Sequence, residues 1–466
     1  MTEVEQIESE HGKTSLSATR RPRIVLVNAW HDDNKGDSAI TSGVLNLADH
    51  VYPDAQVSVV GLTENPDQRA AAMRHVARDR PNTTLIPNPM PSELRGRNHA
   101  TPLLDVPIWF SRLAPAAATT TIGRVPRCYK RIFASADLVV GVGGSNLYTD
   151  TSVQPLVSLA RLFTVAAPLH AAARMGIPTI LLGHTIGPFP ESRPSARRLT
   201  RRMLHGAAHI VVRDEKSLTV AHEIGLSQPE LAPDMAYALT ADQTTRVRTL
   251  TSSLPAQMSR VAVVAMRSHP SLDDSANQRT MGEIASAVDE LRSRGLIDHV
   301  LVVAHTLGPT TIEDDRPVSR RLYAMLADLG VPASYVDDDL SPAELAALYG
   351  EAACMIAVRL HAAILATMSG TPTFAISYFS SKSEGVMRAS GLGEAVGTFA
   401  EVTAEAMVAG LTSQMTSPEA RRALTATAES HQDTLRRRAC EWFGTARTST
   451  ENTGQANQTN TNEGER

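Results

Sequence analysis

Short apolar segments alternate with segments of helical period along most of the chain, and this alternation constrains the fold more than any other feature of the sequence. The apolar segment RIVLVNAW (23–30) precedes a helical pattern at 36–52, and AQVSVVGL (55–62) precedes another. A second series begins after residue 258 with VAVVAMR and runs to an apolar segment at 354–358. Strands that alternate with helices form parallel sheets covered on both faces. We therefore predict an α/β protein of two Rossmann-like, doubly wound parallel-sheet domains that face a cleft.

Shifts in composition divide the chain into regions. Residues 1–22 and 446–466 are polar and have almost nothing to bury, so we expect both to be disordered. The prolines and mixed polarity of residues 88–130 interrupt the alternation and suggest an insertion or a long loop with short helices. The expected divisions are a leader at 1–22, an N-terminal domain at 23–240, a C-terminal domain at 258–400, C-terminal helices at 401–445 and a tail at 446–466.

Charge and cysteine content limit the class of protein. The formal net charge of −4 argues against a general nucleic-acid-binding protein. The three cysteines, Cys128, Cys354 and Cys440, lie far apart without metal-ligand spacing, which favours a reducing compartment. We find no signal peptide and no apolar run of the roughly 18 residues that a membrane span needs. We therefore expect a cytoplasmic protein.

One arginine-rich segment, near residues 193–202, is a candidate for contact with a membrane. Its arginines suit a solvated helix face, or a patch that contacts lipid phosphates. The second interpretation would place the protein peripherally at the inner face of the membrane.

Two charged or titratable residues, Arg359 and His361, stand where the apolar segment 354–358 gives way to a helical pattern. A packed joint between a strand and a helix needs neither a guanidinium nor an imidazole. Open α/β sheets bind ligands beyond the carboxyl ends of their strands, and a helix start presents free N–H groups to anions. The pattern therefore predicts an anion site that contains a proton-transfer residue.

Other polar residues also follow predicted strands, where functional loops usually lie. The loop GGSN has neither the spacing of a dinucleotide fingerprint nor the lysine of a P-loop, so a tight turn and a ligand loop both stay open. His184 and His305 are candidate ligand contacts or core residues. Asp32 and Asp33 suit solvated turns, and residues 337–339 suit the start of a helix. The candidate substrate loops contain Gly143, Gly144, Ser145, Asn146, His184, Arg267, His305 and Tyr378.

Several motifs taken together resemble the polysaccharide pyruvyl transferase family. The resemblance extends over roughly residues 23–395. Its motifs are NKGDSAI, GVGGSNL, LLGHTIGPF, VVRDEKS, PDMAYAL and AVRLHAAILATMSGTPTFAISYFSSKSEG. The early Gly-Asp, the central Arg-Asp and the late Arg-Leu-His are specific only in combination.

The resemblance implies a GT-B-like pair of Rossmann-type domains that transfers pyruvate from phosphoenolpyruvate to hydroxyls of a saccharide or glycolipid precursor, forming a ketal. It implies that His361 is the catalytic histidine and Asp37 the carboxylate of the Gly-Asp motif. It implies that Arg359, Leu360 and Arg213 bind the donor, with the C-terminal domain on the donor side and the N-terminal domain on the acceptor side. Lys382 is a further candidate donor contact, although a solvated loop lysine fits its position equally well.

The chemistry of the donor suits these residue types. Phosphoenolpyruvate carries a phosphate and a carboxylate, and arginine binds either group through two parallel hydrogen bonds. Protonation of the enol carbon needs an acid that titrates near neutrality, which histidine provides. Asp37 suits a base for the attacking hydroxyl, a residue that positions the acceptor, or a cap of the first helix. We expect neither a metal nor another cofactor, with phosphoenolpyruvate as co-substrate.

Two other functions stay open. A GT-B glycosyltransferase that uses a nucleotide sugar has the same architecture, but it needs an acid to hold the ribose, and none follows Arg359 before Glu384. A non-catalytic binding protein on the same fold is the second alternative. The sequence leaves open the acceptor, the geometry of the ketal and the oligomeric state.

Overall fold

The computed structural model describes residues 21–63, 66–91, 102–149, 154–269, 272–377 and 382–459. Within these ranges, the side chains of 66–68, 102–106, 382–383 and 447–459 are not described.

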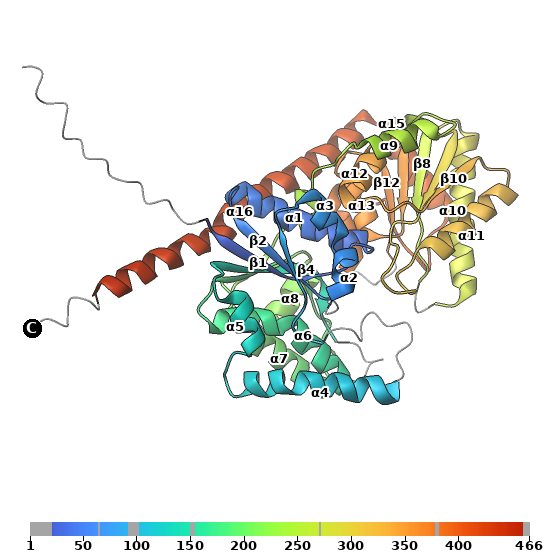
Figure 1. Ribbon diagram of the computed structural model, residues 1–466. Helices are drawn as coiled ribbons and strands as arrows, with labels where there is room; N and C mark the ends of the chain where they lie inside the picture. The colour runs from blue at the N-terminus through green and yellow to red at the C-terminus, as the bar shows by residue number, and fades with distance from the viewer. Residues whose placement is uncertain are drawn as a thin grey trace, which may run out of the picture.

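Two parallel sheets, one in each half of the chain, form the framework (Figure 1). The first has the strand order β3-β2-β1-β4-β5-β6-β7 and the second the order β10-β9-β8-β11-β12-β13. Both are doubly wound, so the prediction of two Rossmann-like domains is confirmed. The strands are β1 (Arg23–Ala29), β2 (Gln56–Gly61), β3 (Thr84–Ile86), β4 (Leu138–Leu147), β5 (Thr179–Ile186), β6 (His209–Val212), β7 (Pro229–Leu231), β8 (Val261–Ala265), β9 (His299–Val303), β10 (Ala333–Val336), β11 (Cys354–Ala357), β12 (Thr373–Ser377) and β13 (Val396–Thr398).

Helices cover both faces of each sheet (Figure 1). In the N-terminal half they are α1 (Lys35–Val51), α2 (Pro66–Ala72), α3 (Arg74–Asp79), α4 (Pro102–Thr121), α5 (Arg127–Phe133), α6 (Pro155–Arg174), α7 (Pro194–Leu204), α8 (Glu215–Glu223), the short helix η2 (Met235–Ala238) and α9 (Thr245–Ser253). The remaining helices are η3 (Met258–Arg260), α10 (Asp274–Ser293), α11 (Arg316–Asp328), α12 (Pro342–Gly350), α13 (Leu360–Thr367), α14 (Lys382–Met387), η4 (Arg388–Leu392), α15 (Ala404–Thr416) and α16 (Pro418–Thr459).

The strand order explains the segment 88–130, which the sequence suggested as an insertion. Because β3 lies at one edge of the first sheet and β4 pairs with β1, the chain must cross the sheet between them. This crossover contains α4, a helix of 20 residues, and the start of α5.

Helix α6 has the length and apolar composition of a membrane-spanning helix, which the sequence analysis did not expect. However, 67% of its apolar window is buried inside the protein. It packs against the first sheet and contributes Leu162 and Val165 to the core there. A buried core helix passes the same test of length and composition.

Helix α16 ties the C-terminal half back to the N-terminal domain (Figure 1). It buries Trp442 and Phe443 completely, and Tyr52 of the N-terminal domain donates a hydrogen bond to the carbonyl of Phe443 at 3.0 Å. Trp442 and Arg438 also bond to Glu230 of β7. The helix continues to Thr459, within the segment 446–466 for which the sequence suggests disorder.

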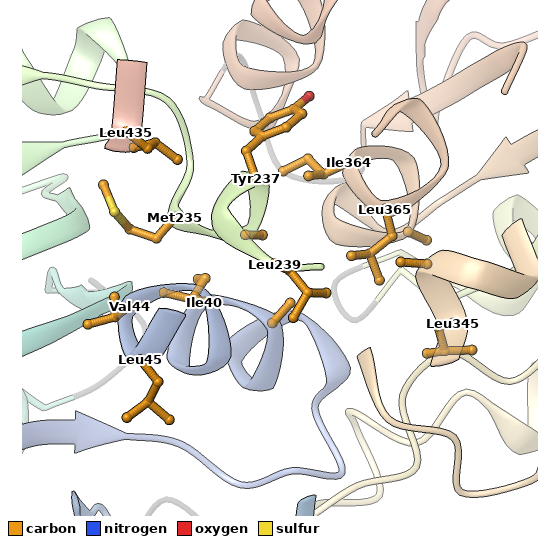
Figure 2. Close-up of a cluster of buried hydrophobic side chains, with 14 of the residues drawn as sticks. Ile40, Val44, Leu45, Met235, Tyr237, Leu239, Leu345, Ile364, Leu365 and Leu435 are labelled. Atoms are coloured by element: carbon orange, nitrogen blue, oxygen red, sulfur yellow. The ribbon is translucent and has the colours of Figure 1, made fainter. Parts of the chain in front are cut away.

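A single hydrophobic cluster extends from the first sheet through the domain interface into the second sheet (Figure 2). Ile40 and Val44 of α1, Met235 of η2, and Ile364 and Leu365 of α13 belong to it. The two domains therefore share part of one core, which sets how their sheets face each other.

Gly43 permits the close packing of α1 on η2. A Cβ at this position would lie 1.9 Å from the carbonyl oxygen of Met235. Because backbone cannot move aside cheaply, we expect Gly43→Ala to destabilise the protein by about 1–3 kcal/mol or more. A Cβ on Gly282 of α10 would meet no atom within 4 Å, so Gly282→Ala is the matched control and should be neutral or stabilising by roughly 0.5–1 kcal/mol. Thermal unfolding of both variants tests this; equal melting temperatures would contradict the packing.

Candidate active site

The Gly-Asp and Arg-Leu-His motifs meet at the domain interface. Helix α1 follows β1, helix α13 follows β11, and each begins at the carboxyl edge of its sheet, where the strand order reverses. A Cβ on Gly36 would lie 2.3 Å from Nδ1 of His361, so the imidazole rests against the glycine. The predicted site residues of the two halves are therefore neighbours.

Arg213 is the centre of the polar contacts on the N-terminal side. It follows β6, and its buried guanidinium donates to Thr185 Oγ1 at 3.0 Å, to Ser145 Oγ at 3.1 Å and to Asp234 Oδ2 at 2.7 Å. These bonds hold the guanidinium in one orientation. Because Ser145 is exposed, the arginine lies just below a surface open to solvent.

Asp234 links Arg213 to His361. It caps η2 by accepting a hydrogen bond from the N–H of Ala236 at 2.9 Å. Burial pushes its pKa upward, but the charges of Arg213 and His361 outweigh burial and hold the pKa well below its usual range. Asp234 is therefore a carboxylate at neutral pH.

His361 lies against both members of the Arg213–Asp234 ion pair. Its Nε2 lies 3.4 Å from a terminal nitrogen of Arg213 and 3.6 Å from Oδ2 of Asp234. A neutral ring can accept from the arginine at Nε2, whereas a cationic ring faces the carboxylate. Nε2 can therefore accept from Arg213 or donate to Asp234 with the ring in one place.

Asp37 lies in the first turn of α1 and faces the carboxyl end of β4. The N-cap of α1 is Asn34, which accepts from the N–H of Asp37, so Asp37 does not cap this helix. A Cβ on Gly144 would lie 3.2 Å from Oδ1 of Asp37. Burial raises the pKa of Asp37 to about 6, against an opposing effect of His361. The carboxyl group can therefore accept a proton near neutral pH.

Arg359 already has a carboxylate partner. Its Nε and one terminal nitrogen donate to the two oxygens of Asp315 at 3.0 and 2.6 Å, and the same terminal nitrogen donates to the carbonyl of Glu313 at 2.6 Å. Burial raises the pKa of Asp315, although Arg359 and Arg267 act in the opposite direction. A donor anion would have to share Arg359 with Asp315, so the donor-binding role of this arginine stays a prediction.

The start of α13 has no side-chain cap. Its N-cap is Arg359, whose side chain makes no capping bond, and Leu360 and His361 form the first turn. By contrast, α8 is capped by Asp214 and α12 by a complete capping box at Ser341. The N–H groups at the start of α13 are therefore not used by a capping side chain, which suits an anionic ligand.

The other residues predicted for the site differ in burial and surroundings. His184 and His305 are buried, and burial lowers the pKa of His184 to about 4 and that of His305 well below its usual range, so both are neutral. A Cβ on Gly143 would overlap the carbonyl of Gly183, so this glycine serves the packing of β4 on β5. Asn146 is half-buried beside Gly144. Tyr378 and the side chain of Lys382 lie outside the described residues.

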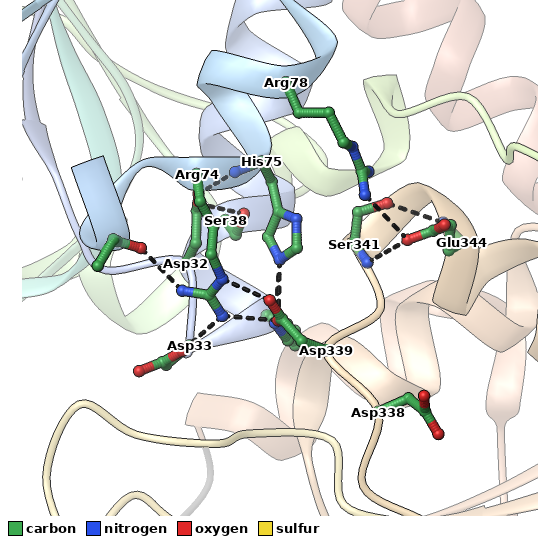
Figure 3. A network of polar contacts seen from close by, with 12 residues as sticks. Asp32, Asp33, Ser38, Arg74, His75, Arg78, Asp338, Asp339, Ser341 and Glu344 are labelled. Carbon is green, nitrogen blue, oxygen red and sulfur yellow. Dashed lines mark hydrogen bonds and ion pairs between the residues drawn. The ribbon is translucent and has the colours of Figure 1, made fainter. Parts of the chain in front are cut away.

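A second polar cluster joins the two domains beside this site (Figure 3). Asp339, which follows β10, contacts Lys35, Arg74 and His75 of the N-terminal domain. Arg74 also donates to Asp33 at 2.6 Å. The sequence suggested that Asp33 and Asp339 are residues of solvated turns or a helix start. Instead, Asp339 forms ion pairs between the domains and Asp33 pairs with Arg74 within the N-terminal domain, because the strand-end loops of the two sheets face each other.

Sequence reasoning missed the carboxylates that hold the site together. Asp234 and Asp315 lie in loops without a strong local signal, although Asp234 is part of the motif PDMAYAL. Among the described residues, no group of three or more His, Cys, Asp or Glu side chains is arranged to hold a metal ion.

Comparison with models of known families shows which family these motifs come from. Residues 34–381 match the model of the polysaccharide pyruvyl transferase family. The chain belongs to this family. The resemblance seen in the sequence is thereby confirmed over most of the chain.

A curated relative extends the similarity to a protein of polysaccharide biosynthesis. The amylovoran biosynthesis protein AmsJ of Erwinia amylovora is 26% identical over 236 residues, which are 47% of this chain and 53% of AmsJ. The chain thus spans about half the length of that curated relative.

Two solved structures share the arrangement of domains. The UDP-GlcNAc 2-epimerase of Neisseria meningitidis has a TM-score of 0.51 at 11% identity, covering 89% of this chain and 99% of its own. The sucrose-phosphate synthase of Thermosynechococcus elongatus has a TM-score of 0.51 at 13% identity, covering 94% and 100%. At such low identity the likeness shows the fold alone, which is the predicted GT-B-like pair of parallel-sheet domains.

The raised pKa of Asp37 predicts a pH-dependent effect on stability. Because the folded pKa, about 6, lies above the ordinary value of 3.8, ionised Asp37 disfavours the folded state above pH 6, and this penalty disappears as the pH falls below about 4. We expect Asp37→Asn to raise the melting temperature at pH 8 and to lose this advantage toward pH 4. The exposed Asp328 provides the control Asp328→Asn. A difference in melting temperature between Asp37→Asn and the wild type that does not change with pH would contradict the raised pKa of Asp37.

Proposed function

We propose that the protein transfers pyruvate from phosphoenolpyruvate to hydroxyls of a saccharide or glycolipid precursor, forms a pyruvate ketal and releases phosphate. The observation that carries the proposal is the meeting of His361 from one domain with Asp37, Arg213 and Asp234 from the other. A proton donor, a base and a fixed cation are thereby assembled only where the two domains join. Family membership supports the same reaction.

The cationic side of the site suits an anionic donor. Arg213 has a fixed orientation, and the start of α13 offers N–H groups that no side chain caps. Leu360 supplies backbone at this first turn. A phosphate or carboxylate bound between Arg213 and α13 would lie beside His361. Arginine and a helix start together favour such a group over a neutral one.

Addition to the donor needs one proton delivered and one removed. A sugar hydroxyl attacks C2 of phosphoenolpyruvate while His361 delivers a proton to C3, which converts the methylene into a methyl group. Asp234 stabilises the imidazolium before the transfer, since it faces Nε2 at 3.6 Å as a carboxylate. Phosphate then leaves C2, a second hydroxyl of the acceptor adds there and closes the ketal, and the proton of that hydroxyl passes to the departing phosphate.

Asp37 is the proposed base for the attacking hydroxyl. Its pKa of about 6 makes it mostly ionised at pH 7, yet basic enough to accept a proton. It lies on the N-terminal side, next to Gly144 at the carboxyl end of β4, where Ser145 is exposed to solvent. An acceptor sugar entering past Ser145 would reach Asp37 and the donor together.

Replacing His361 tests the acid role directly. His361→Gln keeps a polar side chain but removes the transferable proton, so we expect phosphate release to fall by about 10²–10⁴-fold while the melting temperature and the affinity for phosphoenolpyruvate stay near those of the wild type. His50→Gln, at an exposed position at the end of α1, is the matched control. Robust turnover by His361→Gln would exclude the acid role.

The identity of the donor is tested by binding. Phosphoenolpyruvate should stabilise the protein in a thermal-shift titration, and UDP- or GDP-sugars should not, because the acids beside the donor-side arginines, Asp234 and Asp315, are already paired with them rather than available to hold a ribose. Stabilisation by a nucleotide sugar alone would overturn pyruvyl transfer in favour of glycosyl transfer.

A further inference from the structure

The helical layer on the outer face of the first sheet is strongly basic. Residues 107–136 contain five basic residues and no acidic one, and residues 154–206 contain seven basic residues and a single acidic one, Glu191. We call these two segments, which include α5, α6, α7 and most of α4, the basic layer. The whole chain has a net charge of −4, so positive charge is concentrated here and the remainder is strongly acidic.

Most of this charge is at the surface. The helices of the basic layer bury their apolar sides against the first sheet, in a core that includes Trp109, Tyr129 and Met203. The exposed basic side chains of the layer are Arg112, Arg124, Arg127, Lys130, Arg131, Arg174, Arg198, Arg201 and Arg202. Glu223 of the neighbouring α8 lies 4.0 Å from Arg197 and offsets only a small part of the positive charge of the layer.

Apolar side chains are exposed along α4, the outermost helix of this layer (Figure 1). Ile108 is 56% exposed and Ile122 is 68% exposed. Pro115, also exposed, lies seven residues after Ile108 and therefore on the same face of the helix, and Ile122 follows directly where the helix ends at Thr121. Arg112 shares this face. The outer side of α4 thus combines apolar and cationic groups.

Arginines surround the exposed isoleucine at the end of α4. Arg202 of α7 donates to the carbonyl of Thr121 at 3.1 Å, and Arg174 of α6 donates to the carbonyl of Gly123 at 3.0 Å. Arg124 follows two residues after Ile122. The guanidinium groups of Arg174 and Arg202 are therefore fixed beside Ile122 rather than spread at random over the surface.

We propose that the basic layer docks the protein onto an anionic phospholipid surface, with α4 lying along the bilayer. Interfacial helices bind in this way, since their apolar side chains enter the headgroup region while their cations meet lipid phosphates. A nucleic acid would match the charge but not the exposed isoleucines, and the aromatic rings Trp109 and Tyr129, which would otherwise stack on bases, are buried.

Docking in this orientation brings the candidate active site toward the bilayer. Helix α6 starts shortly after β4, whose end carries Ser145 of the site, and Leu156 in its first turn is 70% exposed. The docking face therefore adjoins the edge of the sheet where the site lies. This orientation suits a glycolipid acceptor, but the proposed lipid binding does not depend on the reaction.

Vesicle binding tests the proposal. The full-length protein should sediment with vesicles of phosphatidylcholine containing about 30% phosphatidylglycerol, but not with phosphatidylcholine alone, and 1 M salt should release it because exposed charges are then screened. Arg124→Gln/Arg198→Gln/Arg201→Gln should weaken the binding at least tenfold, since each arginine near the surface contributes about fivefold. Ile122→Ser should weaken it several-fold by about the same factor at low and at moderate salt, because the apolar contact is not screened.

A control variant that loses three charges elsewhere on the protein distinguishes binding through the basic layer from an effect of the overall net charge. Arg422→Gln/Arg436→Gln/Arg437→Gln removes the same three charges from exposed positions of α16 and should leave vesicle binding unchanged. Phosphate release with a soluble acceptor should be the same in both triple variants, so failure of docking can be told from failure of the proposed reaction. Equal loss in both triple variants, no binding to anionic vesicles, or tighter binding to RNA than to vesicles would overturn the proposal.

Discussion

The shared hydrophobic core between the two domains is the constraint on which the site depends. It runs from Ile24 in the first sheet, through α1, η2 and α13, to Val263 in the second sheet. Gly43 allows α1 to approach η2, whose capping residue is Asp234, while α13 carries His361 at its start. The same packing that joins the domains therefore sets the distance between His361, Asp234 and the Gly-Asp motif.

Buried ion pairs fix the charged side chains at this joint. Arg213 binds Asp234 and Arg359 binds Asp315, and all four side chains are almost completely buried. Because burying charges is costly, such pairs contribute little net stability, but removing one partner leaves an uncompensated charge. Their value here is orientation: a guanidinium that is already held loses little freedom when an anion arrives. The interdomain contacts of Asp339 act in the same direction by keeping the two halves together.

The sequence predicted the architecture and singled out polar residues that the structure brings together, because both depend on local patterns. Alternation of strand and helix indicates parallel sheets, and polar residues after strands indicate where ligands bind, which singled out Arg213 and His361. Partners across the fold could not be predicted. Asp315 is 44 residues from Arg359 and Asp339 is 304 residues from Lys35. The packing of the two domains determines which strand-end loops meet. Hydrophobic periodicity along the chain does not predict this packing.

The most direct measurement is a crystal structure of the protein with phosphoenolpyruvate bound. The account predicts that the donor lies at the domain joint, with an anionic group at Arg213 or the start of α13 and with C3 roughly 3–3.5 Å from a ring nitrogen of His361. It also predicts that Asp37 faces the same ligand from the opposite domain. Phosphoenolpyruvate bound within one domain, away from His361, would contradict the claim that the two halves together form the active site.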